Sequence, residues 1–460
     1  MVFSMHYLPN SHPEVKKEML KEIGIGSIEE LFSDVPKELI RKDIEGLPKD
    51  PMPEQEVFKV VRLILKKNRP ITSFPCFLGG GVWVHYVPSA VKAIISRSEF
   101  LTSYTPYQPE VSQGILQALF EYQSLMAELL DMDVVNASMY DWASALGEAA
   151  LMAMRITKRR KILVPRLAGW ERKLVLKTYV SPHEAVIEEV SFNMETGQIS
   201  LEDLESKVGE EAAAVYLENP NFLGVIEEHV DEISDLVHKK GALLIVGVEP
   251  ISLGLIRPPG SYGADVVIGE GQPLGLPPSF GGPLLGIFAC RDDLTLIRQM
   301  PGRIVGLTTT KDGSKRGFVL ALTTREQHIR REKATSNICT NETLCAVALA
   351  VYLSLLGRTG LRKLCESIVY NTYYVIKKLQ KIGGVKVPIF KAFHFKDFAI
   401  KFERSADEVL KALQHRGVQG GIPLKRYYPE LGESALFSVT EVHSLEDLNA
   451  LINAIKEVVE

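Results

Sequence analysis

The part of the chain between residues 161 and 290 alternates short, almost entirely apolar runs with segments of helical periodicity. The apolar runs predict strands at 161–165, 185–190, 212–217, 242–246, 265–268 and 284–288. Helices are predicted between them at 200–208 and 230–240, and Gly241 is a favourable C-terminal cap for the second. Continuous apolar strands that alternate with helices are typical of a mostly parallel sheet covered on both faces. The sequence therefore predicts an α/β fold.

A chain of 460 residues is too long for one hydrophobic core. We expect an N-terminal helical arm at 1–66, a large α/β domain at 67–335 and a smaller α/β domain at 336–460. In the arm, Ser27 followed by Glu30 predicts a capping box. In the last part, helical segments at 341–356 and 360–381 precede candidate strands at 398–402 and 435–439.

Composition narrows the class of partner. With 46% hydrophobic residues, 24% charged residues and a net charge of -4, the chain is typical of soluble globular proteins. The small charge argues against a nucleic-acid or membrane-surface partner. We find no apolar run of about 18 residues and no signal-peptide pattern at the N-terminus. Five cysteines without a CxxC motif predict reduced thiols, no metal site and a cytoplasmic location.

Two glycine-rich or hydroxyl-rich stretches are candidates for ligand binding. Small and hydroxyl residues at 136–147 precede a predicted helix at 149–156 and could hold a phosphate at its N-terminus. Alternatively, Ser138, Asp141 and Ser144 only cap and pack this helix. The glycines at 79–81 could approach a ligand closely or simply form a tight turn.

Two further stretches are unusual in their side chains. Residues 104–114 combine tyrosines, prolines and amides, which suit a pocket or an interface as well as a packed loop. Residues 325–337 concentrate cations that could bind a carboxylate or phosphate, or form a solvated, salt-bridged face. The basic run at 158–161 is interpreted as such a face.

Residues 77–81, 104–110 with 112–114, and 325–340 together resemble the P-protein, or glycine decarboxylase, family of the glycine cleavage system. The similarity is to the first (alpha) subunit of the split, two-chain form. It implies a pyridoxal-phosphate-dependent transferase of fold type I with a seven-stranded type of sheet. It also implies a heterodimer with a second (beta) subunit that carries pyridoxal phosphate. Together the two subunits would decarboxylate glycine and transfer the aminomethyl group to the lipoyl arm of the H-protein.

The stretch 264–283 matches the strand and glycine-rich loop that carry the cofactor lysine in fold type I. Counting back from the loop glycines, this position holds Gln272, whose amide cannot form a Schiff base. The aspartate that pairs with the pyridinium nitrogen is replaced at Gly247, and Leu146 stands where a group often stacks on the ring. With Ser144, these residues define a degenerate cofactor pocket. We therefore expect no catalytic residue and no covalently bound cofactor in this chain.

Fold type I sites lie between two subunits, so the resemblance implies that this chain completes the partner's site. The residues expected to do so are His85, Tyr86, Tyr104, Thr105, Tyr107, Gln108 and Ser112. Two alternatives remain. The chain could be a self-sufficient pyridoxal-phosphate enzyme that uses another lysine, such as Lys311 or Lys333. It could also be a scaffold protein that inherited the fold.

Overall fold

The computed structural model describes residues 9–41, 46, 51–103 and 105–460. The chain divides into two compact units, Met1–Arg69 and Pro70–Glu460. The first unit contains the helices α1 (Pro13–Ile23) and α2 (Glu54–Leu65), neither of which has a buried residue. The predicted capping box is wrong, because Ser27 precedes a 3-10 helix (Ile28–Phe32) and its side chain makes no cap hydrogen bond. Instead, the carboxylate of Glu30 accepts from the backbone N–H of Gly26 at 3.0 Å.

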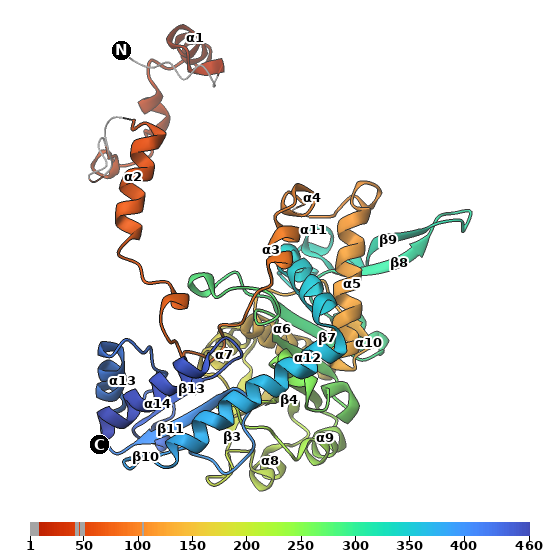
Figure 1. The fold of residues 1–460 in the computed structure, drawn as a ribbon. Coiled ribbons are helices and arrows are strands. Elements are labelled where there is room, and N and C mark those ends of the chain that lie inside the picture. The colour runs from red at the N-terminus through yellow and green to blue at the C-terminus, as the bar shows by residue number, and fades with distance from the viewer. Residues whose placement is uncertain (1–8, 42–45, 47–50, 104) are drawn as a thin grey trace. The chain divides into compact units, whose positions relative to one another are not determined.

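A seven-stranded sheet forms the centre of the second unit (Figure 1), in the order β1-β7-β6-β5-β4-β2-β3. Five strands run parallel: β2 (Lys161–Pro165), β3 (Val186–Val190), β4 (Ala212–Glu218), β5 (Leu243–Val248) and β6 (Val266–Glu270). β7 (Gly286–Cys290) is antiparallel to β6, and β1 (Val134–Val135) is antiparallel to β7. The six strands predicted for this region are all present, whereas the short β1 was not predicted.

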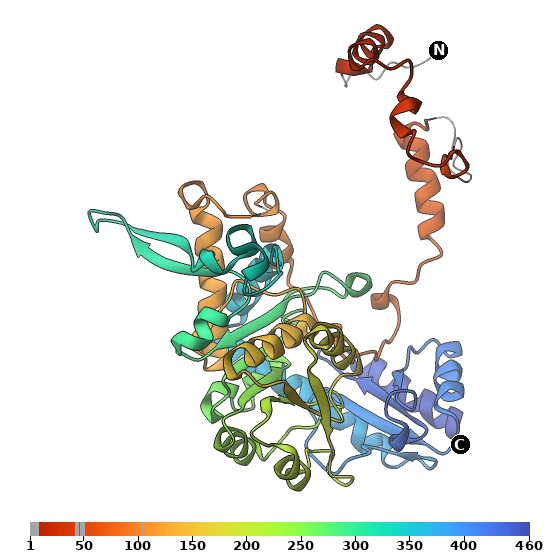
Figure 2. The same ribbon diagram turned by 180° about the vertical axis from the view of Figure 1, so that it is seen from behind.

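Helices cover both faces of this sheet, as the opposite views of Figures 1 and 2 show. One face carries α6 (Trp142–Thr157), α7 (Trp170–Val180) and α10 (Leu294–Gln299). The other carries α5 (Gln113–Leu130), α8 (Leu201–Lys207), α9 (Val230–Lys239) and part of α12 (Thr343–Leu379). Within β4, Tyr216 packs against the helices of the α6 face, while Val215 and Leu217 pack against those of the α5 face. Because both faces are buried, the strands read as continuous apolar runs.

A second, antiparallel sheet has the strand order β10-β11-β13-β12. Its strands are β10 (Val385–Lys386), β11 (Asp397–Phe402), β12 (Ile422–Pro423) and β13 (Ser434–Ser438). The end of α12 packs on one face with α13 (Ala406–His415) and α14 (Leu445–Val459). Phe77, which precedes the large sheet in the sequence, also packs into this core and pairs with the backbone of Gln419 and Ser438. The core beside the four-stranded sheet thus includes a segment that sequence order places with the seven-stranded one.

Helix α12 links the two sheets. Gly357 has non-helical dihedral angles (φ 58°, ψ -177°) and separates the two helical segments that the sequence predicted. Within the described residues, α12 is also the one helix long and apolar enough to cross a membrane by length and composition, but half of its most apolar stretch is buried inside the protein. That burial is typical of a core helix.

The remaining elements lie around the N-terminal end of α12. They include α3 (Ser89–Ile95), α4 (Ser98–Leu101) and α11 (Gln327–Arg330). A hairpin of β8 (Ile304–Thr309) and β9 (Arg316–Ala321) projects from this part of the unit (Figure 1). The hairpin was not predicted, although β9 contains the apolar run 318–321, because its outer residues are exposed and mostly polar.

Candidate functional site

Gln272 is separated from the end of β6 by Gly271 alone, and its side chain is completely buried. Its amide oxygen accepts from the backbone N–H of Trp83 at 3.0 Å. Its amide nitrogen donates to the carbonyl of Trp83 at 3.0 Å and to that of Leu276 at 2.7 Å. The glutamine therefore binds the backbone of residue 83 as a neighbouring strand would. A lysine at this position could donate to the carbonyls but could not accept from the N–H of Trp83.

The space beside Gly247 is filled by aromatic side chains. A Cβ atom on Gly247 would lie 2.5 Å from the hydroxyl oxygen of Tyr216 and 2.8 Å from the ring of Trp142, so an aspartate would fit only if these side chains moved aside. The guanidinium of Arg172 stacks on the Trp142 ring at 3.5 Å and pairs with Glu218 at 3.0 Å. The cavity that remains beside these side chains measures about 10 Å³. A space of this size is too small for a pyridine ring.

The N-terminus of α6 is occupied by groups of the chain itself. Asp141 and Ser144 form a capping box, with the N–H of Ser144 donating to the Asp141 carboxylate at 2.6 Å. The capping interpretation of these two residues is therefore confirmed. The N–H of Trp142 donates to the carboxylate of Glu270 at 3.3 Å. Glu270 thus lies where a helix N-terminus would hold an anion.

Glu270 is a buried carboxyl that the sequence did not single out. It also accepts from the backbone N–H groups of Gln272 at 3.0 Å and Leu285 at 2.8 Å. Burial raises its pKa to about 8, although these N–H groups favour the ionised form. Leu146, at the expected ring-stacking position, is buried in the core between α6 and the sheet. The residues around Gln272 therefore do not fit a pyridoxal phosphate group.

A network of buried charges joins the two sheets beside this filled pocket. Lys396 pairs with Glu249 at 2.9 Å and lies 3.9 Å from the centre of the Trp83 ring. Its ammonium also donates to Nε2 of His85 at 3.0 Å. Burial, helped by Lys396, lowers the pKa of His85, so the neutral ring donates from Nδ1 to Glu441 at 2.8 Å. This network of charges runs from Glu249, at the end of β5, to Glu441, which follows β13 of the four-stranded sheet.

This arrangement separates two of the residues expected at the interface. His85 has both ring nitrogens bonded inside the protein, whereas Tyr86 is 65% exposed. Tyr86 is therefore the one of the two whose side chain is accessible to a partner. On the same side of Gln272, the Nε1–H of Trp83 donates to both carboxylate oxygens of Asp397 at 3.1 and 3.0 Å. Burial raises the pKa of Asp397 to about 6.

Tyr107 lies at the surface, and a buried arginine contacts both its hydroxyl and its ring. Its side chain is 47% exposed. Arg303 donates to the Tyr107 hydroxyl at 2.7 Å and lies over its ring at 4.7 Å. The same guanidinium donates to the carbonyl of Cys339 at 2.8 Å. Arg303 thus joins the two stretches at 104–114 and 325–340, although it belongs to neither.

The other expected interface residues are placed as follows. Gln108 is exposed, and Thr105 and Ser112 are half-buried. Tyr104 lies outside the described residues. Ser112 precedes α5 without a side-chain cap hydrogen bond. Whether these side chains contact a partner stays a prediction.

The cationic stretches are mostly bonded within the chain. The guanidinium of Arg325 donates to backbone carbonyls, including that of Gly302 at 3.0 Å, so it fastens a loop. Arg160 pairs with Glu184 at 2.6 Å and Lys161 with Glu188 at 2.8 Å, which confirms the salt-bridged interpretation for these two cations. In the part of the chain that the structure describes, no cluster of three or more metal-binding side chains is found.

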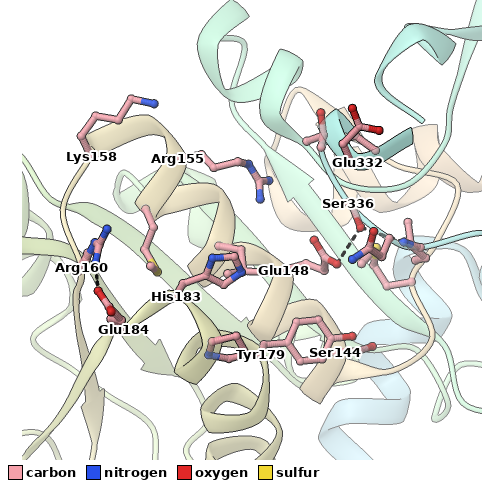
Figure 3. Close-up of a pocket in the computed structure, with 18 of the residues that line it drawn as sticks. Ser144, Glu148, Arg155, Lys158, Arg160, Tyr179, His183, Glu184, Glu332 and Ser336 are labelled. Atoms are coloured by element: carbon pink, nitrogen blue, oxygen red, sulfur yellow. Dashed lines mark hydrogen bonds and ion pairs between the residues drawn. The ribbon is translucent and has the colours of Figure 1, made fainter. Parts of the chain in front are cut away.

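A groove of about 950 Å³ lies between α6, the turn after α7 and the segment 332–338 (Figure 3). Glu148 lies on its floor and accepts from the hydroxyl of Ser336 at 2.7 Å. Cationic side chains stand around the groove, among them Arg155, Lys158 and Arg160. Three stretches singled out in the sequence, at 136–147, 158–161 and 325–337, line the groove, but no pattern within one of them indicated that they come together.

A family model described as "Glycine cleavage system P-protein" matches residues 5–455. The chain belongs to this family. A protein of Staphylothermus marinus named "Probable glycine dehydrogenase (decarboxylating) subunit 1" is 52% identical over 98% of both chains. A protein of the same name from Thermococcus onnurineus is 53% identical over 98% of this chain and 99% of its own length.

Solved structures support the P-protein fold. A crystal structure of the glycine decarboxylase (P-protein) of the glycine cleavage system, in inhibitor-bound form, matches with a TM-score of 0.85 and 42% identity. It covers 97% of this chain and 98% of its own. The sphingosine-1-phosphate lyase of Burkholderia pseudomallei matches with a TM-score of 0.67 over 91% of this chain and 92% of its own. Its 13% identity shows the fold alone. The expected fold type I architecture is confirmed.

Neither alternative lysine of this P-protein chain lies near the filled pocket. Lys311 is exposed in the turn between β8 and β9, and Lys333 is exposed in a 3-10 helix (Arg331–Lys333). The buried lysine next to the pocket is Lys396, and its ammonium is engaged by Glu249 and His85. No observation in the described residues therefore favours a self-sufficient enzyme.

Proposed function

We propose that this chain is subunit 1 of the decarboxylating glycine dehydrogenase of the glycine cleavage system. With a lysine-bearing subunit 2 it forms the cytoplasmic enzyme that decarboxylates glycine and passes the aminomethyl group to the lipoylated H-protein. Pyridoxal phosphate is bound by subunit 2. This chain alone is inactive. The observation that carries the proposal is the side chain of Gln272, whose amide is bonded to backbone groups on both sides in a pocket without room for the cofactor.

The contribution of this chain is then the surface it offers to subunit 2. Tyr86, Tyr107 and Gln108 are exposed on the body of the second unit. Tyr107 is the best defined of the three, because Arg303 holds both its hydroxyl and its ring face. An aromatic ring that is fixed before binding loses little conformational entropy when a partner covers it. We infer that this residue completes the site of subunit 2.

The test is reconstitution from separately purified subunits. Each subunit and their mixture are titrated with pyridoxal phosphate and assayed for glycine-dependent release of carbon dioxide in the presence of lipoylated H-protein. We expect Schiff-base absorbance in subunit 2 and in the mixture, and carbon dioxide release from the mixture alone. Subunit 1 that turns yellow and decarboxylates glycine by itself would overturn the proposal.

A scaffold protein is distinguished by the same assay. If the mixture is no more active than subunit 2 alone, this chain is dispensable for the reaction. Replacement of Tyr107 by Phe then probes the surface: loss of the hydroxyl should lower the activity of the mixture without changing the melting temperature of subunit 1. Unchanged kinetics for this variant would remove Tyr107 from the site.

A further inference from the structure

The groove beside α6 is not used by the function proposed above, yet it is built unlike an ordinary surface depression. Its walls include the apolar side chains of Leu151, Met154 and Ile338, and it is open to solvent on one side. The cations Arg155, Lys158 and Arg160 stand around it (Figure 3). Apolar and polar side chains mixed in this way are typical of a protein interface that is not permanent.

Glu148 on the floor of the groove has an unsatisfied oxygen. The residue is 5% exposed. Its Oε1 accepts from the hydroxyl of Ser336 at 2.7 Å, whereas Oε2 is buried and has no hydrogen-bond partner among the described residues. A buried carboxyl oxygen without a donor is rare in folded proteins and is costly unless a ligand or partner supplies one.

The neighbouring cations do not satisfy this oxygen. Arg155 donates to the side chain of Gln299 at 2.9 Å and to its carbonyl at 3.1 Å. Arg160 is paired with Glu184 at 2.6 Å. Lys158, which ends α6 in a left-handed conformation (φ 61°), has no ion-pair partner in the described ranges. The groove thus presents the free Oε2 of Glu148 on its floor and the cation Lys158 at its rim, with the exposed carboxylate of Glu332 on the wall formed by 332–338.

Size and position favour a polypeptide over a small metabolite. A volume of about 950 Å³ is at the upper end of small-molecule pockets, which are usually more enclosed. One wall, the segment 332–338, belongs to the stretch that Arg303 joins to Tyr107 through the carbonyl of Cys339. The groove is therefore continuous along the chain with the surface proposed to meet subunit 2.

We propose that a segment of subunit 2 inserts into this groove, donates a hydrogen bond to Oε2 of Glu148 and places an acidic side chain against Lys158. The donor is a lysine, an arginine, an amide or a hydroxyl of the inserted segment. This inference rests on the proposed function, because it requires a second subunit. The groove would be a second contact with subunit 2, formed by other segments of the chain than the one that carries Tyr107.

The experiment measures the dissociation constant between purified subunits 1 and 2 by titration calorimetry. Glu148→Leu removes both carboxyl oxygens and with them the proposed acceptor, whereas a glutamine would keep an acceptor oxygen. Lys158→Glu reverses the exposed rim charge and leaves the core untouched. Lys411→Glu is the matched control, a charge reversal at an exposed position of α13 in the small domain. We expect the two groove variants to bind about tenfold or more weakly, and the control to bind as the wild type.

Hydrogen exchange on the intact complex gives an independent readout that does not need a variant to fold. Addition of subunit 2 should slow exchange at the end of α6 and in the segment 332–338. Wild-type affinity for both groove variants, or assembly without this protection, overturns the inference while leaving the proposed function intact. If the wild-type subunits do not associate at all, the proposed function itself fails. Protection produced by inorganic phosphate alone, without subunit 2, would identify an anion site instead and would also overturn it.

Discussion

Replacement of Gln272 by lysine puts back the residue that the fold usually carries, and the structure predicts that it destabilises the chain without restoring the cofactor. The buried N–H of Trp83 would lose its acceptor, which costs about 1–3 kcal/mol. A buried ammonium adds a penalty of a few kcal/mol that lowers the pKa of the new lysine. We expect a loss of about 3–6 kcal/mol at neutral pH from a total stability of about 5–15 kcal/mol.

The assay is urea unfolding followed by tryptophan fluorescence, because two of the three tryptophans, Trp83 and Trp142, line the filled pocket. Gln272→Met is the control, since it removes the same hydrogen bonds without adding a charge. The unfolded state of the Gln272→Lys variant binds a proton that its folded state releases at lower pH. The loss of stability should therefore shrink as the pH rises toward the pKa of free lysine. The loss in Gln272→Met should not depend on pH in this way, because methionine does not titrate.

The refuting result is equally concrete. If Gln272→Lys is as stable as the wild type and develops Schiff-base absorbance with pyridoxal phosphate, trapped by borohydride at position 272, the pocket is open. The side chains of Trp142 and Tyr216 would then have to move aside, contrary to the packing seen around Gly247.

Three further outcomes follow from other contacts. Glu270→Gln should become more stable relative to the wild type as the pH rises from about 4.5 to about 8, by at most about 1.4 kcal/mol per pH unit. The reason is that the raised pKa lets the folded wild type hold a proton on Glu270 that the unfolded chain has lost, so the wild type loses stability over this range. Parallel curves of stability against pH from urea titrations would contradict this. Arg303→Met should lower the activity of the reconstituted enzyme by roughly tenfold or more, because Tyr107 loses the side chain that positions it. The double mutant with Tyr107→Phe should then lose less activity than the two single losses together. Additive losses would show that the two residues act independently. A chain that starts at Pro70 should keep the melting temperature of the second unit within a few degrees, as measured by circular dichroism, because every buried core cluster found in the described residues begins at Phe77 or later; failure of this chain to fold would show that the first unit is part of its core.

The strands of the large sheet and the helices between them could be predicted because their signals are local. A strand buried on both faces is apolar at every position, and a glycine such as Gly241, with φ of 66°, marks the end of a helix by its own conformation. The short β1 carries no such signal, and the apolar run at 318–321 of β9 was not recognised as a strand because the rest of the hairpin is exposed and mostly polar. The capping box at Ser27 fits the local pattern and still does not form, which shows that a local pattern without tertiary packing decides little.

At the candidate site, the sequence alone shows that an amide stands at position 272 and that no carboxylate stands at 247. What fills the space was decided only by the tertiary structure. The backbone of Trp83, the ring of Trp142 and the hydroxyl of Tyr216 reach this place from three separate segments. Lys396 and Glu249, which close the pocket toward the small domain, are also distant in sequence. Which side chains complement one another depends on the three-dimensional path of the chain, and no pattern within a single segment records it.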